Sequence, residues 1–62
     1  MNKVKKLRKE KEWTQQELAD KAGIPSRAVQ RIETEEVKIL DCRLKTIKSI
    51  ADALGVMIED LI

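Results

Sequence analysis

The sequence predicts an all-α protein, a compact bundle of five short helices. Three observations lead to this prediction. Leu, Ile, Ala, Lys and Glu dominate the composition, which is typical of helical proteins. Apolar residues recur at helical spacing, and no segment shows the alternation expected of a strand. Two glycines, Gly23 and Gly55, each follow such a segment at the point where a helix would end. We expect helices over about residues 2–11, 15–22, 25–34, 42–54 and 57–61.

The chain of 62 residues is expected to form a single domain, with no internal repeat, low-complexity stretch or linker. A domain of this size buries only about 60% of the surface that its unfolded chain exposes, so its stability margin is thin. No segment continues beyond the expected bundle, and we therefore expect a small stand-alone protein rather than one with a second, sensing domain.

The first expected helix, residues 2–11, begins with Asn2 as its N-cap and buries Val4 and Leu7. Trp13, the only aromatic residue, follows this helix. We expect the indole to pack onto Leu18 or a near neighbour and to help fill the core. Stacking of the indole on a nucleic-acid base is the alternative use.

Residues 14–34 read as a helix, a tight turn and a second helix. Thr14 and Glu17 are spaced as a capping box, in which each side chain accepts from the other residue's amide. Gly23 provides the left-handed residue that ends the first helix, and Pro25 begins the second, where its missing N–H does no harm. The first helix has a buried face of Leu18, Ala19 and Ala22.

The second of these helices has two different faces. Its apolar face consists of Ala28, Val29 and Ile32. Its polar face consists of Ser26, Arg27, Gln30, Arg31 and Thr34. Side chains of these polar types hydrogen-bond to base edges in the major groove of DNA. The alternative is an ordinary amphipathic helix whose polar face is only solvated.

The fourth helix is expected over residues 42–54, with Asp41 as its N-cap and Gly55 as its terminator. Its core stripe is formed by Leu44, Ile47, Ile50, Ala51 and Leu54. We also expect Ile39 and Leu40, in the preceding loop, to turn into the core.

The last expected helix, residues 57–61, carries more apolar surface than so small a core needs. Val56 and Leu61 should close the core. An unused apolar patch commonly marks an interface, so we expect a homodimer formed through Met57, Ile58, Leu61 and Ile62. The alternative is that these residues complete the core of the monomer.

Composition excludes several classes of function. The chain has no His and one cysteine, Cys42, so zinc or iron sites built from His and Cys are excluded in practice, as is Ser-His or Cys-His catalysis. We therefore expect no enzyme activity, no metal and no cofactor. No apolar run is long enough to cross a membrane, no signal peptide is visible, and a lone cysteine fits a reducing cytoplasm.

The net charge of +2 is small, but the charges are unevenly distributed. Residues 1–13 hold six Lys or Arg against two Glu, whereas acidic residues gather at residues 33–36 and 59–60. A basic segment and separate acidic segments suit a protein that approaches a polyanion with its basic side. A solvated lysine-rich helix face is the simpler reading of the first segment.

Taken together, these motifs resemble the helix-turn-helix of the phage repressor and Cro family, also called the XRE family. The resemblance is carried by residues 14–19, 22–24, 29–33, 50–56 and 59–61 and covers nearly the whole chain. It implies a fold of the lambda-repressor type and a sequence-specific, double-stranded-DNA-binding transcriptional regulator, expected to be a repressor, that acts on a DNA operator as a homodimer. It also implies an ion pair between Arg8 and Glu33 that braces the first helix against the third.

The resemblance assigns DNA-contacting roles residue by residue. The third helix would enter the major groove, with base contacts from Ser26, Arg27, Gln30 and Arg31. Contacts to the DNA backbone would come from Gln15, Gln16, Arg43 and Lys45. Helix-terminal amides would add to phosphate binding.

The chain departs from the family after the third helix. Relatives usually have Asn-Gly and then basic residues here, whereas residues 34–41 form a loop about three residues longer that contains Glu35 and Glu36. Because two glutamates would repel phosphate, the alternative function is a protein-interaction module, or an antitoxin-like partner of a second protein, without strong DNA binding. An enzyme is the weakest alternative, since no base or nucleophile accompanies the carboxylates.

Overall fold

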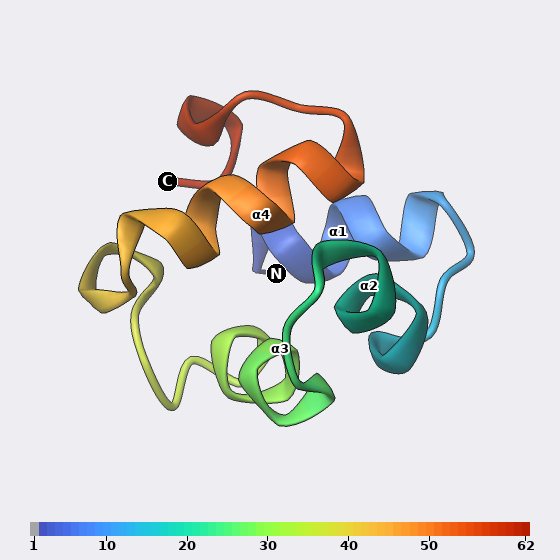
Figure 1. Cartoon of the computed structure of the whole chain (residues 1–62), viewed down its shortest axis with the longest axis horizontal. Helices are drawn as coiled ribbons and strands as arrows, with labels where there is room; N and C mark the ends of the chain where they lie inside the picture. Colours follow the sequence, from blue (N-terminus) through green and yellow to red (C-terminus); the bar gives the residue numbers. More distant parts are fainter. Residues whose placement is uncertain (1) are drawn as a thin grey trace.

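The computed structural model describes residues 2–62 and confirms an all-helical fold (Figure 1). Four α-helices are present in this range: α1 (Lys3–Glu10), α2 (Gln15–Ala22), α3 (Ser26–Glu33) and α4 (Leu44–Leu54). The described residues also form two short 3-10 helices, η1 (Ile39–Asp41) and η2 (Ile58–Asp60). Residues 2–62 contain no strand. The fifth expected helix is therefore a single 3-10 turn.

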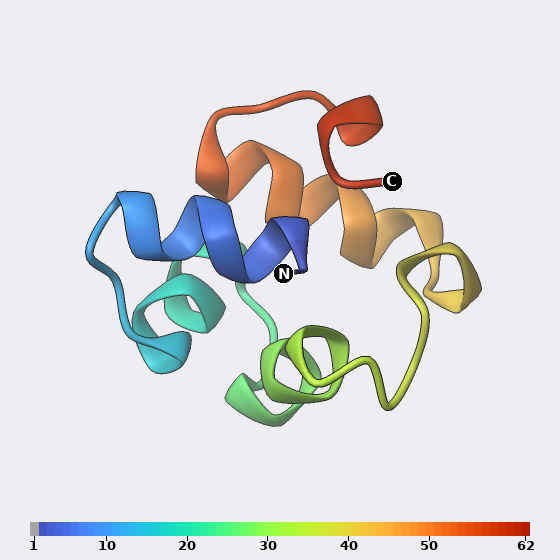
Figure 2. The same ribbon diagram turned by 180° about the vertical axis from the view of Figure 1, so that it is seen from behind.

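The helices pack around α2 and α4. Helix α2 contacts both α3 and α4, α1 contacts α3, and η2 packs against α4. The front and back views both place α3 at the edge of the molecule away from the C-terminal segment (Figures 1 and 2). Helix α3 and the C-terminal segment therefore lie at opposite edges of the molecule.

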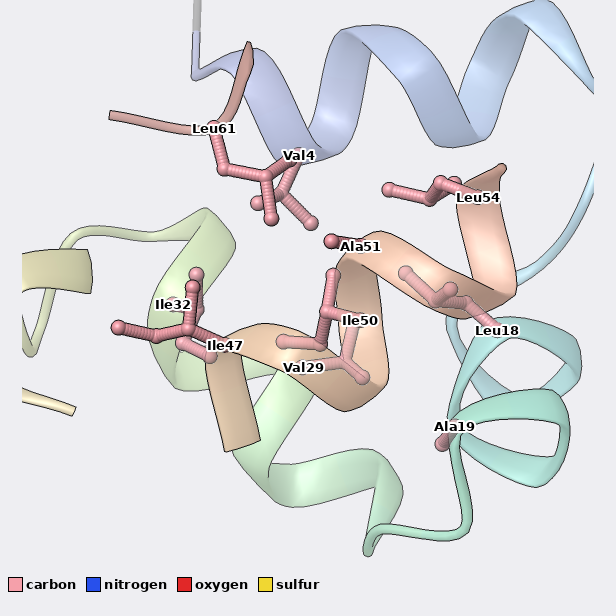
Figure 3. Close-up of a cluster of buried hydrophobic side chains, with 10 residues drawn as sticks. All are labelled: Val4, Leu18, Ala19, Val29, Ile32, Ile47, Ile50, Ala51, Leu54 and Leu61. Carbon is pink, nitrogen blue, oxygen red and sulfur yellow. The ribbon is translucent and has the colours of Figure 1, made fainter. Parts of the chain in front are cut away.

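One hydrophobic core joins the four α-helices to the C-terminal segment (Figure 3). Its members are buried to at least 95%: Val4, Leu18, Ala19, Val29, Ile32, Ile47, Ile50, Ala51, Leu54 and Leu61. Burial of apolar surface is worth roughly 25 cal/mol per Å², so this cluster is the main source of stability. It also explains why α3 turns Val29 and Ile32 inward and its polar face outward.

Three of the α-helices end in the same way, although the sequence marks only two of these ends. The amide of Ile24 donates to the Ala19 carbonyl at 3.0 Å around Gly23, and Val56 donates to Ala51 around Gly55. Both glycines are left-handed, with φ of 70° and 71°, as this motif requires.

Helix α1 ends with the same hydrogen bonds, but without a glycine. The Trp13 amide donates to the Arg8 carbonyl at 3.2 Å, and the residue between them in the turn, Glu12, has φ of 59°. A left-handed conformation is costly for a residue with a Cβ atom. The end of α1 therefore stores backbone strain.

The start of α4 differs from the sequence prediction. Arg43, not Asp41, is the N-cap, and no side chain caps the helix. Asp41 instead belongs to η1, so the helix begins two residues later than expected. Leu44 consequently lies in the exposed first turn, with 68% of its surface accessible, and Leu40 is 72% accessible. The predictions that these two leucines are buried were wrong, whereas Ile39 does pack against the core.

The C-terminal segment divides its apolar residues between the core and the surface. Leu61 is only 4% accessible and closes the core, so its expected place in a dimer interface was wrong. Met57 is 65% and Ile62 49% accessible, and Ile58 is half-buried against the core.

Trp13 packs against the edge of the core, as expected. The ammonium groups of Lys11 and Lys21 lie 5.3 Å and 4.9 Å from the centre of its ring, within the range of cation–π attraction. The indole thus joins the α1–α2 turn to the end of α2.

Candidate nucleic-acid interface

The orientation of α3 is fixed by a buried ion pair with α1. Arg8 donates from Nε to Glu33 Oε2 at 2.7 Å and from Nη2 to Glu33 Oε1 at 2.9 Å. Their side chains are only 10% and 1% accessible. The ion pair that the family resemblance implies is therefore present, in the bidentate geometry that a guanidinium and a carboxylate favour.

Other polar groups complete this junction. The third nitrogen of Arg8 donates to the Trp13 carbonyl, and Gln15 Nε2 donates to Glu33 Oε1 at 3.2 Å. Asn2, which caps α1, also donates from Nδ2 to the Ile32 carbonyl at 3.0 Å. The hydrogen bonds that Arg8 donates to Glu33 raise the pKa of Arg8 above its ordinary value, so the guanidinium stays charged. The C-terminal end of α3 is thus held by α1, by the α1–α2 turn and by α2.

The opposite face of α3 is open. Arg27, Gln30 and Arg31 are exposed, and Ser26 is partly so. A shallow hollow runs along this face and is lined by Ser26, Arg27, Gln30, Arg31, Thr34 and Glu36. All four side chains expected to contact bases therefore lie together on one accessible surface, which we call the α3 face.

A second hollow links the α3 face to the start of α4. Its lining includes Arg31 from α3 and Arg43, the N-cap of α4. Arg31 thus borders both hollows. Lys45 lies in the first turn of α4 and is exposed, but it lines neither hollow. Of the two expected backbone contacts on α4, only Arg43 is placed beside the α3 face.

The two glutamines at the start of α2 are placed differently from each other. Gln15 is partly buried and directs one amide hydrogen to Glu33. Gln16 is exposed and donates to Asp20 Oδ1 at 2.8 Å, within its own helix. The α2 capping box between Thr14 and Glu17 is present, with bonds of 2.9 Å and 3.1 Å.

Glu36 also lines the hollow of the α3 face, a position that the sequence did not predict, although Glu35 and Glu36 were expected to repel phosphate. Its Oε1 lies 3.7 Å from Arg31 Nε, and both side chains are exposed. Its position depends on the preceding residue, Glu35, which has φ of 60° and turns the chain after α3. No sequence signal marks this turn, because glycine, and not glutamate, is the usual residue in this conformation.

Residues 2–62 offer little for metal binding or for attack by a thiol. Within residues 2–62 no cluster of His, Cys, Asp or Glu is arranged to hold a metal ion. Cys42 is partly buried, and this burial, together with the charge of Asp41, raises the pKa of its thiol. A thiol of raised pKa is a poor nucleophile at neutral pH. None of the described helices combines the length and the apolar character that crossing a bilayer requires.

Comparison with known protein families identifies a helix-turn-helix domain in this chain. A family model described as Helix-turn-helix matches residues 4–61, nearly the whole chain. No curated protein and no solved structure matches it. The matched family consists of DNA-binding domains and not of enzymes. The matched range contains the capping box, the Gly23 turn, α3 and the Arg8–Glu33 pair, and the chain belongs to the XRE-type helix-turn-helix family.

Proposed function

We propose that this protein is a sequence-specific, double-stranded-DNA-binding transcriptional regulator that acts as a repressor. One observation carries the proposal: the α3 face presents two exposed arginines with Gln30 and Ser26, while Val29 and Ile32 anchor the other side of the helix in the core. Helix-turn-helix proteins place this helix in the major groove. A repressor needs only to occupy its operator, and nothing beyond the bundle is required for that.

Arg27 and Arg31 are the principal base-reading residues in this proposal. A guanidinium forms two hydrogen bonds with O6 and N7 of guanine, which is worth roughly 1–3 kcal/mol of discrimination against another base. Ser26 and Gln30 lie beside them in the same hollow and make secondary contacts to bases or phosphate. Rigid support of α3 by the Arg8–Glu33 pair keeps these side chains in register with the base pairs.

Contacts to the DNA backbone position the protein without reading sequence. Gln16 is exposed at the start of α2, where the helix dipole attracts phosphate. Gln15 contributes less, because its side chain is partly buried against Glu33. Arg43 and Lys45 bind phosphate at the start of α4, where uncapped helix amides add their own attraction.

Association through the C-terminal segment completes the proposal. Met57 and Ile62 are large, apolar and exposed, and a two-fold dimer would match two operator half-sites, as in other helix-turn-helix proteins. Because α3 lies at the other edge of the molecule, this association would leave the α3 face free (Figures 1 and 2).

A salt titration tests DNA binding directly. Binding of the protein to a fluorescent mixed-sequence duplex is measured by anisotropy between low and physiological salt. The proposal predicts measurable affinity at low salt, and a linear fall of log K with log salt concentration, since each neutralised phosphate releases counterions. The alternative, a protein-interaction module, is favoured by the carboxylate of Glu36 on the α3 face. Absence of binding at the lowest salt concentration would support that alternative.

A further inference from the structure

We propose that Glu36 competes with DNA for Arg31 and so limits the affinity of this protein for the duplex sites that it recognises. This inference rests on the proposed function and adds to it a residue that lowers binding. No basic residue of the α3 face other than Arg31 forms an ion pair within residues 2–62.

The position of Glu36 is the first argument. The Glu36 carboxylate is the only acid among the six side chains that line the hollow of the α3 face. It lies 3.7 Å from Arg31 Nε, one of the donors that a guanidinium offers to a base or a phosphate. Arg31 therefore already faces a carboxylate before DNA binds, whereas Arg27 has no ion-pair partner within residues 2–62.

The strength of the pair is the second argument. The side chains of Arg31 and Glu36 are 46% and 61% accessible, and their separation exceeds that of a direct hydrogen bond. Exposed pairs of this kind are weak and are screened by salt. Glu36 can therefore release Arg31 to DNA, and its effect is a modest reduction of affinity rather than a complete block.

The neighbouring glutamate provides the third argument and a matched control. The chain turns at the left-handed Glu35, and the two adjacent glutamates line different hollows. Glu35 lines a hollow with Asn2 and Lys5 on the α1 side of α3, and it is absent from the lining of the α3 face. Two residues of the same type and charge, adjacent in sequence, thus differ in whether they face Arg31.

The test compares Glu36→Gln with Glu35→Gln in the full chain, each also combined with Arg31→Ala. Affinity for a duplex site selected from a random pool with the unmodified protein is measured by anisotropy at low and physiological salt, and thermal melting checks that each variant is folded. We expect Glu36→Gln to bind about two- to five-fold more tightly at low salt, with a smaller gain at higher salt. Glu35→Gln should bind like the unmodified protein.

The Arg31→Ala background separates competition from general repulsion. If Glu36 acts on Arg31, the gain from Glu36→Gln disappears when Arg31 is absent. Equal affinities of Glu36→Gln and Glu35→Gln would overturn the inference, and so would a gain that persists without Arg31. If neither the unmodified protein nor any variant binds duplex DNA at low salt, the proposed function itself fails, and the inference fails with it.

Discussion

Arg8 of α1 and Glu33 of α3 form two hydrogen bonds, of 2.7 Å and 2.9 Å, inside the protein. Glu33 is the last residue of α3, so this pair ties the C-terminal end of the reading helix to α1. Gln15 of α2 donates to the same carboxylate. Three helices therefore meet at Glu33, and the direction of the α3 face depends on it.

Replacing Glu33 with alanine should cost about 3–5 kcal/mol of unfolding free energy, because the guanidinium of Arg8 would stay buried without its partner. A domain of this length has a total stability of only about 3–9 kcal/mol, so Glu33→Ala should lose a large fraction of it. Urea denaturation followed by circular dichroism measures the loss. Glu10→Ala, which removes an exposed carboxylate from α1, is the control and should change stability by less than about 0.5 kcal/mol. Equal, small losses in both variants would show that the pair is not a structural brace.

Replacing Glu12 with glycine should stabilise the protein, since Glu12 has φ of 59° at the end of α1. Relief of the left-handed strain exceeds the extra entropy of glycine in the unfolded chain, and we expect a net gain of about 0.5–1 kcal/mol. For a domain of this size the gain raises Tm by about 2–8 °C.

The control for Glu12→Gly is Gly23→Ala, the opposite change at the left-handed residue that ends α2. Gly23 has φ of 70°, and no atom lies within 4 Å of the Cβ that an alanine would add. Gly23→Ala should therefore lose about 1 kcal/mol through backbone strain alone. Calorimetry that found Glu12→Gly less stable than the unmodified protein would contradict the strain argument.

Lys45→Ala should weaken binding to all duplexes alike, because Lys45 is proposed to contact phosphate and not bases. The slope of log K against log salt concentration should flatten by about one unit. Lys9→Ala removes an equal charge from the exposed surface of α1, a helix to which no DNA contact is assigned, and should leave the slope nearly unchanged. If the two variants have the same slope, Lys45 does not contact DNA.

The exposed apolar tail predicts self-association. Sedimentation should show a dimer at micromolar concentration, and Met57→Ser combined with Ile62→Ser should shift it to a monomer without loss of helix content. Leu61→Ser is unsuitable for this purpose, because Leu61 is buried and its loss would unfold the core. An unmodified protein that sediments as a monomer at high micromolar concentration, with and without DNA, would rule out the dimer.

The sequence predicted most successfully where local signals decide the structure. The capping box of Thr14 and Glu17 and the left-handed Gly23 set the bounds of α2, and both signals act within one helical turn. The apolar spacing of α3 likewise determined which side would face the core. The polar face of α3 was predictable for the same reason, since it is what remains after Val29 and Ile32 are buried.

The sequence was less informative where longer-range geometry decides the structure. Helical periodicity predicted that Leu44 would belong to the buried stripe of α4. In the structure α4 begins at Leu44, and this first turn extends beyond the core, so that Leu44 is exposed. The left-handed conformations of Glu12 and Glu35 had no signal because neither residue is a glycine. The approach of Glu36 to Arg31 follows from that turn, which has no signal in the sequence. The sequence therefore indicated that the acidic loop could oppose DNA binding, but not that Glu36 would lie beside Arg31.

The most direct test of the α3 face is the ratio of specific to non-specific affinity in Arg31→Ala. A binding site is first selected from a random duplex pool with the unmodified protein, and affinity is then measured for this site and for a scrambled duplex. We predict that Arg31→Ala weakens binding to the selected site by about five- to 150-fold, equivalent to about 1–3 kcal/mol, while affinity for the scrambled duplex changes little. Equal losses on both duplexes would show that Arg31 does not read bases and would contradict the proposed role of the α3 face.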